Sequence, residues 1–425
     1  MAEDLQPTPA EQKLIDAAAK GETADYQVGD KQADNPANGA EWGEERTLRA
    51  EILYDLCTGA RREWKVHAKG VQAVGARITG SLDFQGAEIN APLLLGFCRF
   101  DQPLILRNAR IRTLNLSGSH CQGMRADGLA ARGDVFLRDG FTAEGEVRLL
   151  GADIGGDPSC RAAEFKNSSG FALNAQNMKV VGALFLDRIK LGREGGFNLN
   201  HAKVAQLLDD VNSWPGPGQL ILDGFDYEAI AGDAPTTAEA RLRWLRLQPT
   251  KPFKPQPYEQ LIRVLRRMGH ERDAREIAIA KQDALRKSGE LGWWSSVWRL
   301  FLGVTIGYGY KPWKAFIFMA VFLILGMAVF YGAGFRGLMM PTQAKAGGVT
   351  PDMECATSYP CFHPFMYSVD TFIPIIDFHQ QRYWLPDTSR PGGWGYRLYL
   401  WVHIALGWLL STVAVVGFSG IIKKD

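Results

Sequence analysis

The stretch from Leu104 to Gly123 reads LILRNARIRTLNLSGSHCQG, and it divides into four units of five residues. The first and third residues of each unit are apolar or small, and the others are mostly polar. An α-helix spaces apolar residues three and four apart, and an open strand alternates in twos, so a period of five fits neither. It fits a chain that turns a corner every five residues, with the third residue of each unit pointing inward.

Related units recur over roughly residues 70–230, which makes the repeat the main organising feature of the chain. They are interrupted by single extra residues such as Pro92 and Pro103. The units are LDFQG and AEINA from Leu82, LLLGF and CRFDQ after Pro92, and VFLRD, VRLLG, ADIGG, LFLDR, FNLNH, AKVAQ and LILDG, of which the last begins at Leu220.

These units resemble those of the pentapeptide-repeat β-solenoid, in which four sides make one coil of about twenty residues. The resemblance implies that residues 68–230 form a right-handed quadrilateral β-solenoid. Cys98 and Cys121 fall on inward positions, where we expect them to be buried thiols. The repeats carry many arginines, so the acidic DNA-mimicking role of some members of this class is not expected, and no nucleic-acid partner is predicted.

The open ends of such a coil need covers, because each coil packs only on its neighbours. Residues 1–67 are predicted to be a helical cap with a disordered start, with a helix in EWGEERTLRAEILYDLCTG, residues 41–59. Residues 231–290 are predicted to be a helical connector after the proline-rich stretch QPTKPFKPQPYEQ. Its two helices lie in YEQLIRVLRRMGH and ERDAREIAIAKQDALRKSG, and Gly269 marks the end of the first.

Two segments are long and apolar enough to cross a bilayer. Residues 315–335 and 398–422 contain no Asp, Glu, Lys or Arg, and about twenty such residues span the hydrocarbon core. A buried helix of a soluble protein is the alternative, which the absence of charge disfavours. The net charge of +2 says nothing about an acidic partner, and no signal peptide is predicted in the first forty residues, which are polar.

The distribution of basic residues predicts the orientation of these spans. Thirteen Lys and Arg residues lie between Lys251 and Lys314, whereas only five lie between Arg336 and Arg397. The positive-inside rule therefore places both termini in the cytoplasm of a multi-pass protein of the bacterial inner membrane. The external loop, residues 336–397, contains Cys355 and Cys361, and we expect a disulfide between them. The other four cysteines, Cys57, Cys98, Cys121 and Cys160, form no CxxC and are predicted to be free thiols.

The sequence TIGYG at Thr305–Gly309 nearly matches the selectivity filter of a potassium channel. A filter of that type lies between two spans, because its carbonyls must stand on the pore axis. Thr305–Gly309 precedes both spans and runs into Lys311 and Lys314. Residues 291–314, rich in tryptophan, are instead predicted to be an interfacial amphipathic segment that contacts membrane lipid.

A second stretch, PFMYSVDTFIPIIDFHQQRYW, lies between the two spans. It resembles the pore loop of two-transmembrane potassium channels, and the resemblance covers residues 313–424. Within 363–379, the pore-helix candidates are Tyr367, Ser368, Val369 and Asp370, and the filter candidates are Thr371, Phe372, Ile373, Pro374, Ile375, Ile376, Asp377 and Phe378. The resemblance implies a re-entrant pore helix, permeant ions and a homo-oligomer, with a tetramer favoured and a pentamer possible. It also indicates an inner helix, with His403, Gly407 and Ser411 as candidates.

The filter candidates depart from the potassium-channel pattern. A potassium filter needs glycines so that successive backbone carbonyls can all point inward, and these residues contain none. Pro374 also removes an amide donor, so potassium selectivity is not expected. A ring of Asp377 carboxylates would favour cations, and the apolar residues Ile373, Ile375, Ile376 and Phe378 would make a constriction. His403 is alone within the second span, where it faces a pore or bonds a neighbouring helix.

The leading functional hypothesis is therefore a homo-oligomeric ion channel with a cytoplasmic solenoid. An ordinary external loop with a short amphipathic helix is the alternative for residues 363–379. The alternative functions are a membrane-anchored scaffold for a cytoplasmic protein partner and a membrane-associated oxidoreductase, which would need a flavin, haem or nicotinamide. The sequence contains no GxGxxG after a strand, no GxxxxGK[ST] and no HExxH, so no catalytic residue, metal or cofactor is predicted.

Overall fold

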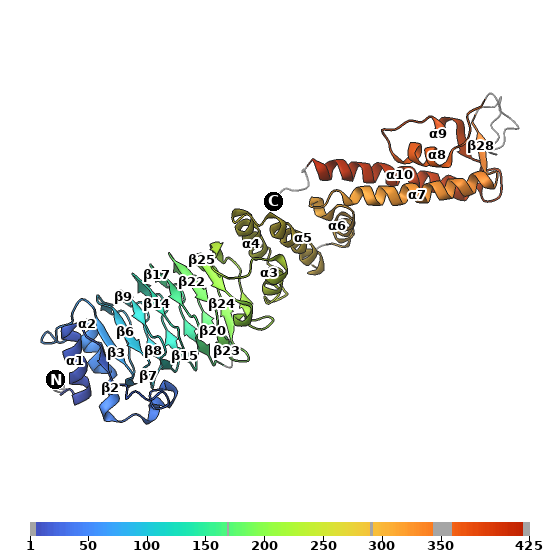
Figure 1. The fold of residues 1–425 in the computed structure, drawn as a ribbon. Coiled ribbons are helices and arrows are strands. Elements are labelled where there is room, and N and C mark those ends of the chain that lie inside the picture. The colour runs from blue at the N-terminus through green and yellow to red at the C-terminus, as the bar shows by residue number, and fades with distance from the viewer. Residues whose placement is uncertain (1–5, 168–169, 290–291, 343–358, 420–425) are drawn as a thin grey trace. The chain divides into compact units, whose positions relative to one another are not determined.

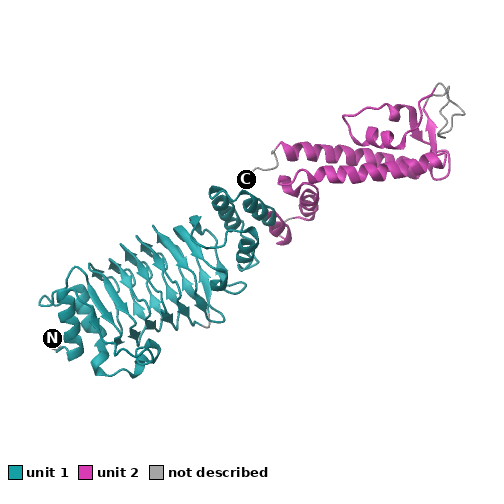
Figure 2. Ribbon diagram, viewed as in Figure 1, with its two compact units in different colours: residues 1–281 teal, residues 282–425 magenta. Residues whose placement is uncertain are grey.

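The computed structural model describes residues 6–167, 170–289, 292–342 and 359–419. It has a mixed fold divided into two units, residues 1–281 and 282–425 (Figure 2). The first unit is a parallel β-solenoid with helices at both ends, and the second consists mainly of helices (Figure 1). The β-solenoid predicted from the repeat is thus confirmed as a fold.

Parallel pairing between successive turns builds the solenoid. One ladder runs through β1 (Ala24–Asp25), β3 (Val71–Val74), β6 (Leu93–Gly96), β10 (Leu114–Asn115), β14 (Val135–Phe136), β18 (Pro158–Ser159), β22 (Ala183–Leu186) and β25 (Lys203–Asp209). Strand β25 joins it to a second ladder, which consists of β5 (Glu88–Ile89), β9 (Arg110–Ile111), β13 (Ala130–Ala131), β17 (Asp153–Ile154), β21 (Lys179–Val180) and β27 (Asp226–Ile230).

Two separate sheets complete each turn. The seven-stranded sheet contains β2 (Thr47–Arg49), β4 (Arg77–Thr79), β7 (Arg99–Phe100), β11 (His120–Cys121), β15 (Thr142–Ala143), β19 (Glu164–Phe165) and β23 (Lys190–Leu191). The six-stranded sheet contains β8 (Leu104–Ile105), β12 (Met124–Arg125), β16 (Val147–Arg148), β20 (Phe171–Asn174), β24 (Gly196–Asn198) and β26 (Leu220–Ile221).

The five-residue period follows from the core and from the corners. The first and third residues of a unit, such as Leu104 and Leu106, are completely buried and stack on the same positions of neighbouring turns. At the corner, the Leu106 carbonyl accepts a hydrogen bond from the Ala109 amide at 3.1 Å. Asn108 between them has a φ of 52°, which a turn of this kind needs at its third residue and which asparagine tolerates.

The predicted free thiols lie in this part of the chain. Cys98, Cys121 and Cys160 are buried within the solenoid, and Cys57 is half-buried. All four are free cysteines. Burial raises the pKa of each thiol to about 12, so at neutral pH they are inert apolar groups.

The helices at the N-terminal end differ from the prediction. The expected disordered start contains helix α1 (Pro9–Lys20), because Thr8 and Glu11 form a capping box that fixes its first turn. The helix expected over residues 41–59 is confined to its second half, α2 (Ala50–Thr58). The residues before α2 form the short helices η1 (Pro36–Glu41) and η2 (Glu44–Arg46) and then strand β2, which pairs with β4.

The C-terminal end of the solenoid is covered by α3 (Ala238–Leu245), α4 (Gln256–Arg267) and α5 (Glu271–Lys287), which follow the short helix η3 (Val211–Ser213). The predicted pair is α4 and α5, and Gly269 lies between them with a φ of 85°. Helix α3 was not predicted. Its Arg241 is completely buried and forms a two-pronged ion pair with Asp209 at 2.8 and 2.9 Å.

In the second unit, two helices are long and apolar enough to cross a membrane, α7 (Lys314–Phe335) and α10 (Gly393–Phe418). Between them lie β28 (Met339–Pro341), α8 (Pro364–Phe372), α9 (Gln380–Tyr383) and β29 (Trp384–Pro386), and β28 pairs with β29. Helix α6 (Trp293–Ile306) and the short helix η4 (Gly307–Gly309) precede α7. The TIGYG letters therefore form the end of α6 and the turn after it, and Ile306 packs against Ala414 of α10.

Candidate functional site

Helix α8 lies against both apolar helices (Figure 1). Near its start, the Tyr367 ring meets the Phe330 ring of α7 edge-on, with 4.7 Å between ring centroids. Just before α8, Phe362 lies against Gly334, where an added Cβ atom would come within 3.1 Å of its ring. The start of α8 is therefore level with the C-terminal end of α7.

The other end of α8 reaches the middle of both apolar helices. The Phe372 ring stacks on Phe322 of α7 with 6.2 Å between centroids. The Phe372 carbonyl lies against Gly407 of α10 so closely that an added Cβ atom would be 1.9 Å from its oxygen. Along α7, Phe322 is 13 residues from Phe335, or about 20 Å at 1.5 Å per residue.

A buried hydrogen-bond network holds α8 between its neighbours. The Ser368 hydroxyl donates to the Leu323 carbonyl of α7 at 3.0 Å, and Nε2 of His403 on α10 lies 3.2 Å from the same hydroxyl oxygen. Since the hydroxyl proton goes to Leu323, His403 donates from Nε2 and accepts the Tyr399 hydroxyl on Nδ1, 3.4 Å away. Gly326 of α7 leaves room for this crossing, because an added Cβ atom would lie 2.4 Å from the Ser368 oxygen.

After α8 the chain turns sharply and comes back. The Ile376 amide donates to the Ile373 carbonyl at 3.1 Å, which closes a turn with Pro374 at its second position, where proline is favoured. The chain then returns to the start of α8, where the Gln380 side chain accepts from the His363 amide at 3.1 Å and donates to the Cys361 carbonyl at 3.2 Å. Helix α8 and residues 373–380 thus form a hairpin, in which residues 373–380 are the returning arm.

Asp370 ties the two arms of this hairpin together. Its carboxylate, on the buried part of α8, accepts hydrogen bonds from the Phe378 amide at 2.5 Å and the Gln381 amide at 2.8 Å. Hydrogen bonds of this kind to a charged group are stronger than those between neutral groups. Asp370 therefore positions the returning arm against the helix.

The returning arm exposes apolar side chains and backbone oxygens. Ile375 is 87 % exposed, and Ile376 and Phe378 are exposed as well. Among the hydrogen bonds of the described residues, none reaches the carbonyl oxygens of Pro374, Ile375 and Ile376. Asp377 is exposed too, and its carboxylate is paired with Arg382 at 2.8 Å.

The predicted site residues are placed as follows. The pore-helix candidates Tyr367, Ser368, Val369 and Asp370 all lie on α8 and are buried. Thr371 and Phe372, which were assigned to the filter, still belong to the helix, whose last backbone hydrogen bond runs from the Ile373 amide to the Val369 carbonyl at 2.9 Å. The non-helical segment is therefore Ile373–Phe378.

The inner-helix candidates lie on α10. His403 and Gly407 contact α8, so of the two roles left open for His403 the structure has the bond to a neighbouring helix. The Ser411 hydroxyl is buried and has no hydrogen-bond partner among the described residues. The α7 residues Leu323, Gly326 and Phe330 complete the site and were not predicted. A glycine within an apolar span is the signal that could have identified Gly326.

Two features lie outside this description. Cys355 is not among the described residues, so its pairing with Cys361 stays a prediction. Within the described residues, no group of three His, Cys, Asp or Glu side chains is placed to hold a metal ion.

The segment predicted to be interfacial, residues 291–314, is held near its C-terminal end by a hydrogen bond. The Tyr308 hydroxyl donates to Asp283 at 2.8 Å, and burial together with this bond raises the pKa of Tyr308 to about 12.

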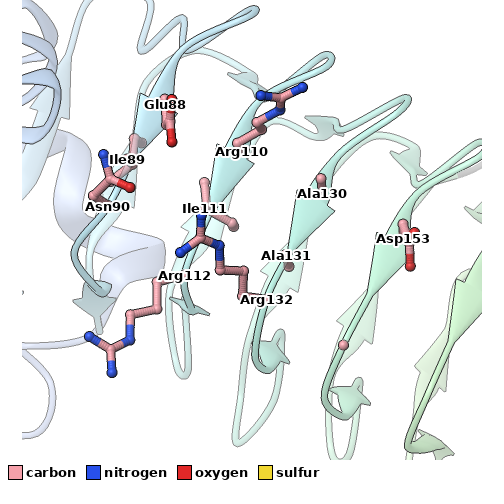
Figure 3. A pocket seen from close by; sticks show the side chains of 11 residues that line it. Glu88, Ile89, Asn90, Arg110, Ile111, Arg112, Ala130, Ala131, Arg132 and Asp153 are labelled. Carbon is pink, nitrogen blue, oxygen red and sulfur yellow. The ribbon is translucent and has the colours of Figure 1, made fainter.

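A shallow depression of about 250 Å³ lies on the solenoid, over β5, β9, β13 and β17 (Figure 3). It forms because the small residues Ala130 and Ala131 lie between larger side chains on the neighbouring turns. Arg110, Arg112 and Arg132 line it and are exposed. In the part of the chain that the structure describes, none of the three forms an ion pair, whereas Arg77, Arg148 and Arg161 elsewhere on the solenoid do.

No protein-family model matches the chain, and neither the curated proteins nor the solved structures contain a match.

Proposed function

We propose that this chain is one subunit of a homo-oligomeric membrane ion channel of the two-transmembrane pore-loop type. In this proposal α7 is the outer helix, α8 is a re-entrant pore helix, Ile373–Phe378 is the constriction and α10 is the inner helix. The solenoid is a regulatory or docking domain in the cytoplasm. Its four sides are supported by the four ladders, to each of which a turn adds one strand, as in β6, β7, β8 and β9. Its right-handed coil is expected from the resemblance to pentapeptide-repeat solenoids.

The observation that carries the proposal is the depth that α8 reaches between α7 and α10. Phe372 meets Phe322, which is about 20 Å from one end of α7 and about 12 Å from the other. The hydrocarbon core of a bilayer is about 30 Å thick. If α7 spans the bilayer, the end of α8 therefore lies near its middle, which an amphipathic helix on an external loop would not do.

The returning arm supports an oligomer. Non-helical backbone at membrane depth is tolerated only where it is buried in protein or lines a water-filled cavity. The unbonded carbonyls of Pro374, Ile375 and Ile376 need such surroundings, and one subunit does not supply them. Several copies around an axis would enclose water there, and by resemblance to pore-loop channels four copies are favoured and five are possible.

The exposure of α7 supports its insertion into lipid. Of the 18 most apolar consecutive residues of α7, only 17 % are buried, whereas a core helix of a soluble protein would be mostly buried. Trp293, Trp294 and Trp298 on α6 are also exposed, as expected for aromatic side chains at the headgroup level. The basic residues that flank the two spans would lie in the cytoplasm by the positive-inside rule, and both termini with them. In a bacterial inner membrane, α9 would then lie outside.

Planar-bilayer recording of the purified full-length protein tests this function. We expect single-channel currents that Ile376→Ala changes in conductance and that Asp370→Asn reduces in amplitude or open time, because the returning arm loses a charged anchor. Val181→Ala, an exposed change on the solenoid, is the matched control and should leave the currents unaltered. Bilayers that stay silent under voltage, tension and varied pH would rule the channel out.

The depression on the solenoid is lined by Arg110, Arg112 and Arg132 and also by the carboxylates of Glu88 and Asp153. Its excess of arginines favours a second candidate function, a membrane-anchored scaffold that binds an acidic surface of a cytoplasmic protein. Exposed arginines without ion-pair partners are free to pair with carboxylates of another molecule. A polyglutamate peptide is a direct probe: it should bind the full-length protein in low salt, and the Arg112→Glu, Arg132→Glu double variant should lose this binding. Equal binding by the variant and by Lys31→Glu would exclude the depression as the site.

A further inference from the structure

A pair of opposite charges joins the returning arm to α9. One carboxylate oxygen of Asp377 lies 2.8 Å from the Arg382 guanidinium, and the other lies 3.1 Å from Nδ1 of His379. Asp377 and Arg382 are 49 and 67 % exposed, so the pair faces open space in a single subunit. The sequence-based prediction considered Asp377 alone, without its partner.

Local hydrogen bonds hold the Asp377 carboxylate and the backbone of Arg382 in place. His379 adopts the left-handed conformation, with a φ of 63°, and its amide donates to the Asp377 carboxylate at 2.8 Å. Arg382 sits on α9, and its carbonyl accepts a hydrogen bond from the Thr342 hydroxyl next to β28. The pair therefore lies after the turn at Pro374, where the chain runs back toward the start of α8.

We propose that this pair sets the charge selectivity of the pore, with Arg382 as the residue that keeps it from preferring cations. The inference rests on the proposed channel function. A carboxylate paired with a guanidinium has no net charge, so a ring of these pairs attracts neither cations nor anions strongly. The ring of Asp377 carboxylates alone would favour cations, as rings of acidic side chains do in cation channels. The wild-type pore therefore passes small cations and anions with similar ease.

Reversal potentials in a potassium chloride gradient across a planar bilayer measure this selectivity. We expect a wild-type value near zero, a shift toward the potassium equilibrium potential in Arg382→Gln, and a shift toward the chloride equilibrium potential in Asp377→Asn. Removing one unit charge a few ångströms from an ion path should change the permeability ratio about tenfold. The double variant should return close to the wild-type value.

Arg390→Gln is the matched control, because Arg390 belongs to the same loop, is exposed, and pairs with Asp387 and not with a residue of the returning arm. It should leave the reversal potential unchanged. The opposite signs of the two single variants separate a selectivity role from a structural one, which would lower the currents of both without opposite shifts. Currents whose reversal potential ignores Asp377 and Arg382 would overturn this inference and leave the channel standing, whereas a silent wild-type protein would overturn both.

Discussion

At the scale of single residues, the glycines of the apolar helices decide how closely α8 can approach. Gly326 and Gly407 are the points where Ser368 and the Phe372 carbonyl come nearest to α7 and α10. A side chain at either position would occupy space that α8 fills. These glycines therefore act by leaving room, and their effect is visible only once the helices are packed.

Gly407→Ala should loosen the packing of α8, because its Cβ atom would lie 1.9 Å from the backbone oxygen of Phe372, which cannot rotate away. Overpacking of this kind costs about 1–3 kcal/mol. Thermal unfolding of the detergent-solubilised protein measures the loss. Gly395→Ala on the same helix is the control, since no atom lies within 4 Å of its added Cβ, and equal melting of the two variants would contradict the packing described here.

At the scale of elements, the helices at the two ends of the solenoid are attached by buried charged groups. Glu11 of α1 pairs with Arg49, the residue before α2, and Asp209 of β25 pairs with Arg241 of α3. A buried charge that loses its partner is strongly destabilising, because it keeps its desolvation cost without compensation. Each pair therefore holds its helix to the end of the solenoid.

The N-terminal pair predicts a dependence of stability on pH. Burial by itself would raise the pKa of Glu11, but hydrogen bonds from Arg49 and from the Thr8 amide outweigh it and hold the pKa below its ordinary value. Such a group stabilises the fold above the pKa of the unfolded chain, and its contribution is lost as the pH falls through the folded pKa. Chemical unfolding across pH should show wild type more stable than Glu11→Gln at pH 7, with the difference vanishing in acid; a constant difference would refute the linkage.

The C-terminal pair predicts a large effect of a single residue. Arg241→Ala leaves the Asp209 carboxylate buried without its partner and should lower the free energy of unfolding by about 3–5 kcal/mol. Urea unfolding of the full-length protein, followed by circular dichroism of the solenoid, measures this change. Arg243→Ala on the same helix is exposed and should change it by less than about 0.5 kcal/mol, so comparable losses in both variants would argue against the buried pair.

At the scale of the whole molecule, the exposed apolar side chains of the returning arm fit the proposed assembly, in which other copies of the chain would cover them. Ile375 is 87 % exposed in one subunit although it is apolar and follows a helix buried between two others. In the proposed assembly it lies near the symmetry axis, close to the same residue of its neighbours. Its exposure is then a property of the isolated chain and not of the protein in the membrane.

Ile375→Cys should therefore form disulfide-linked dimers of the full-length protein when it is oxidised in native membranes. Non-reducing electrophoresis detects the product. Val181→Cys on the solenoid is comparably exposed and should not cross-link, which separates neighbours at an axis from random collision. Equal cross-linking of both variants, or a monomeric mass in detergent, would count against the assembly.

Local repetition and composition were enough to predict several elements of this fold. A period of five predicted the solenoid, because inward and corner positions recur within a few residues. Two runs of more than twenty residues without Asp, Glu, Lys or Arg predicted the two apolar helices. Helices α1 and α3 were missed although each begins at a threonine N-cap, Thr8 and Thr237, which the sequence itself contains.

The contacts between those elements became visible only in the folded chain. That Ser368 meets Leu323 and His403, and that Asp370 anchors the returning arm, depends on contacts between residues 8 to 45 positions apart. The same packing paired Asp377 with Arg382, a partner that the letters of the filter-like segment did not include. Short-range patterns encode single elements, whereas contacts between elements depend on shape and distance, which a single sequence does not state.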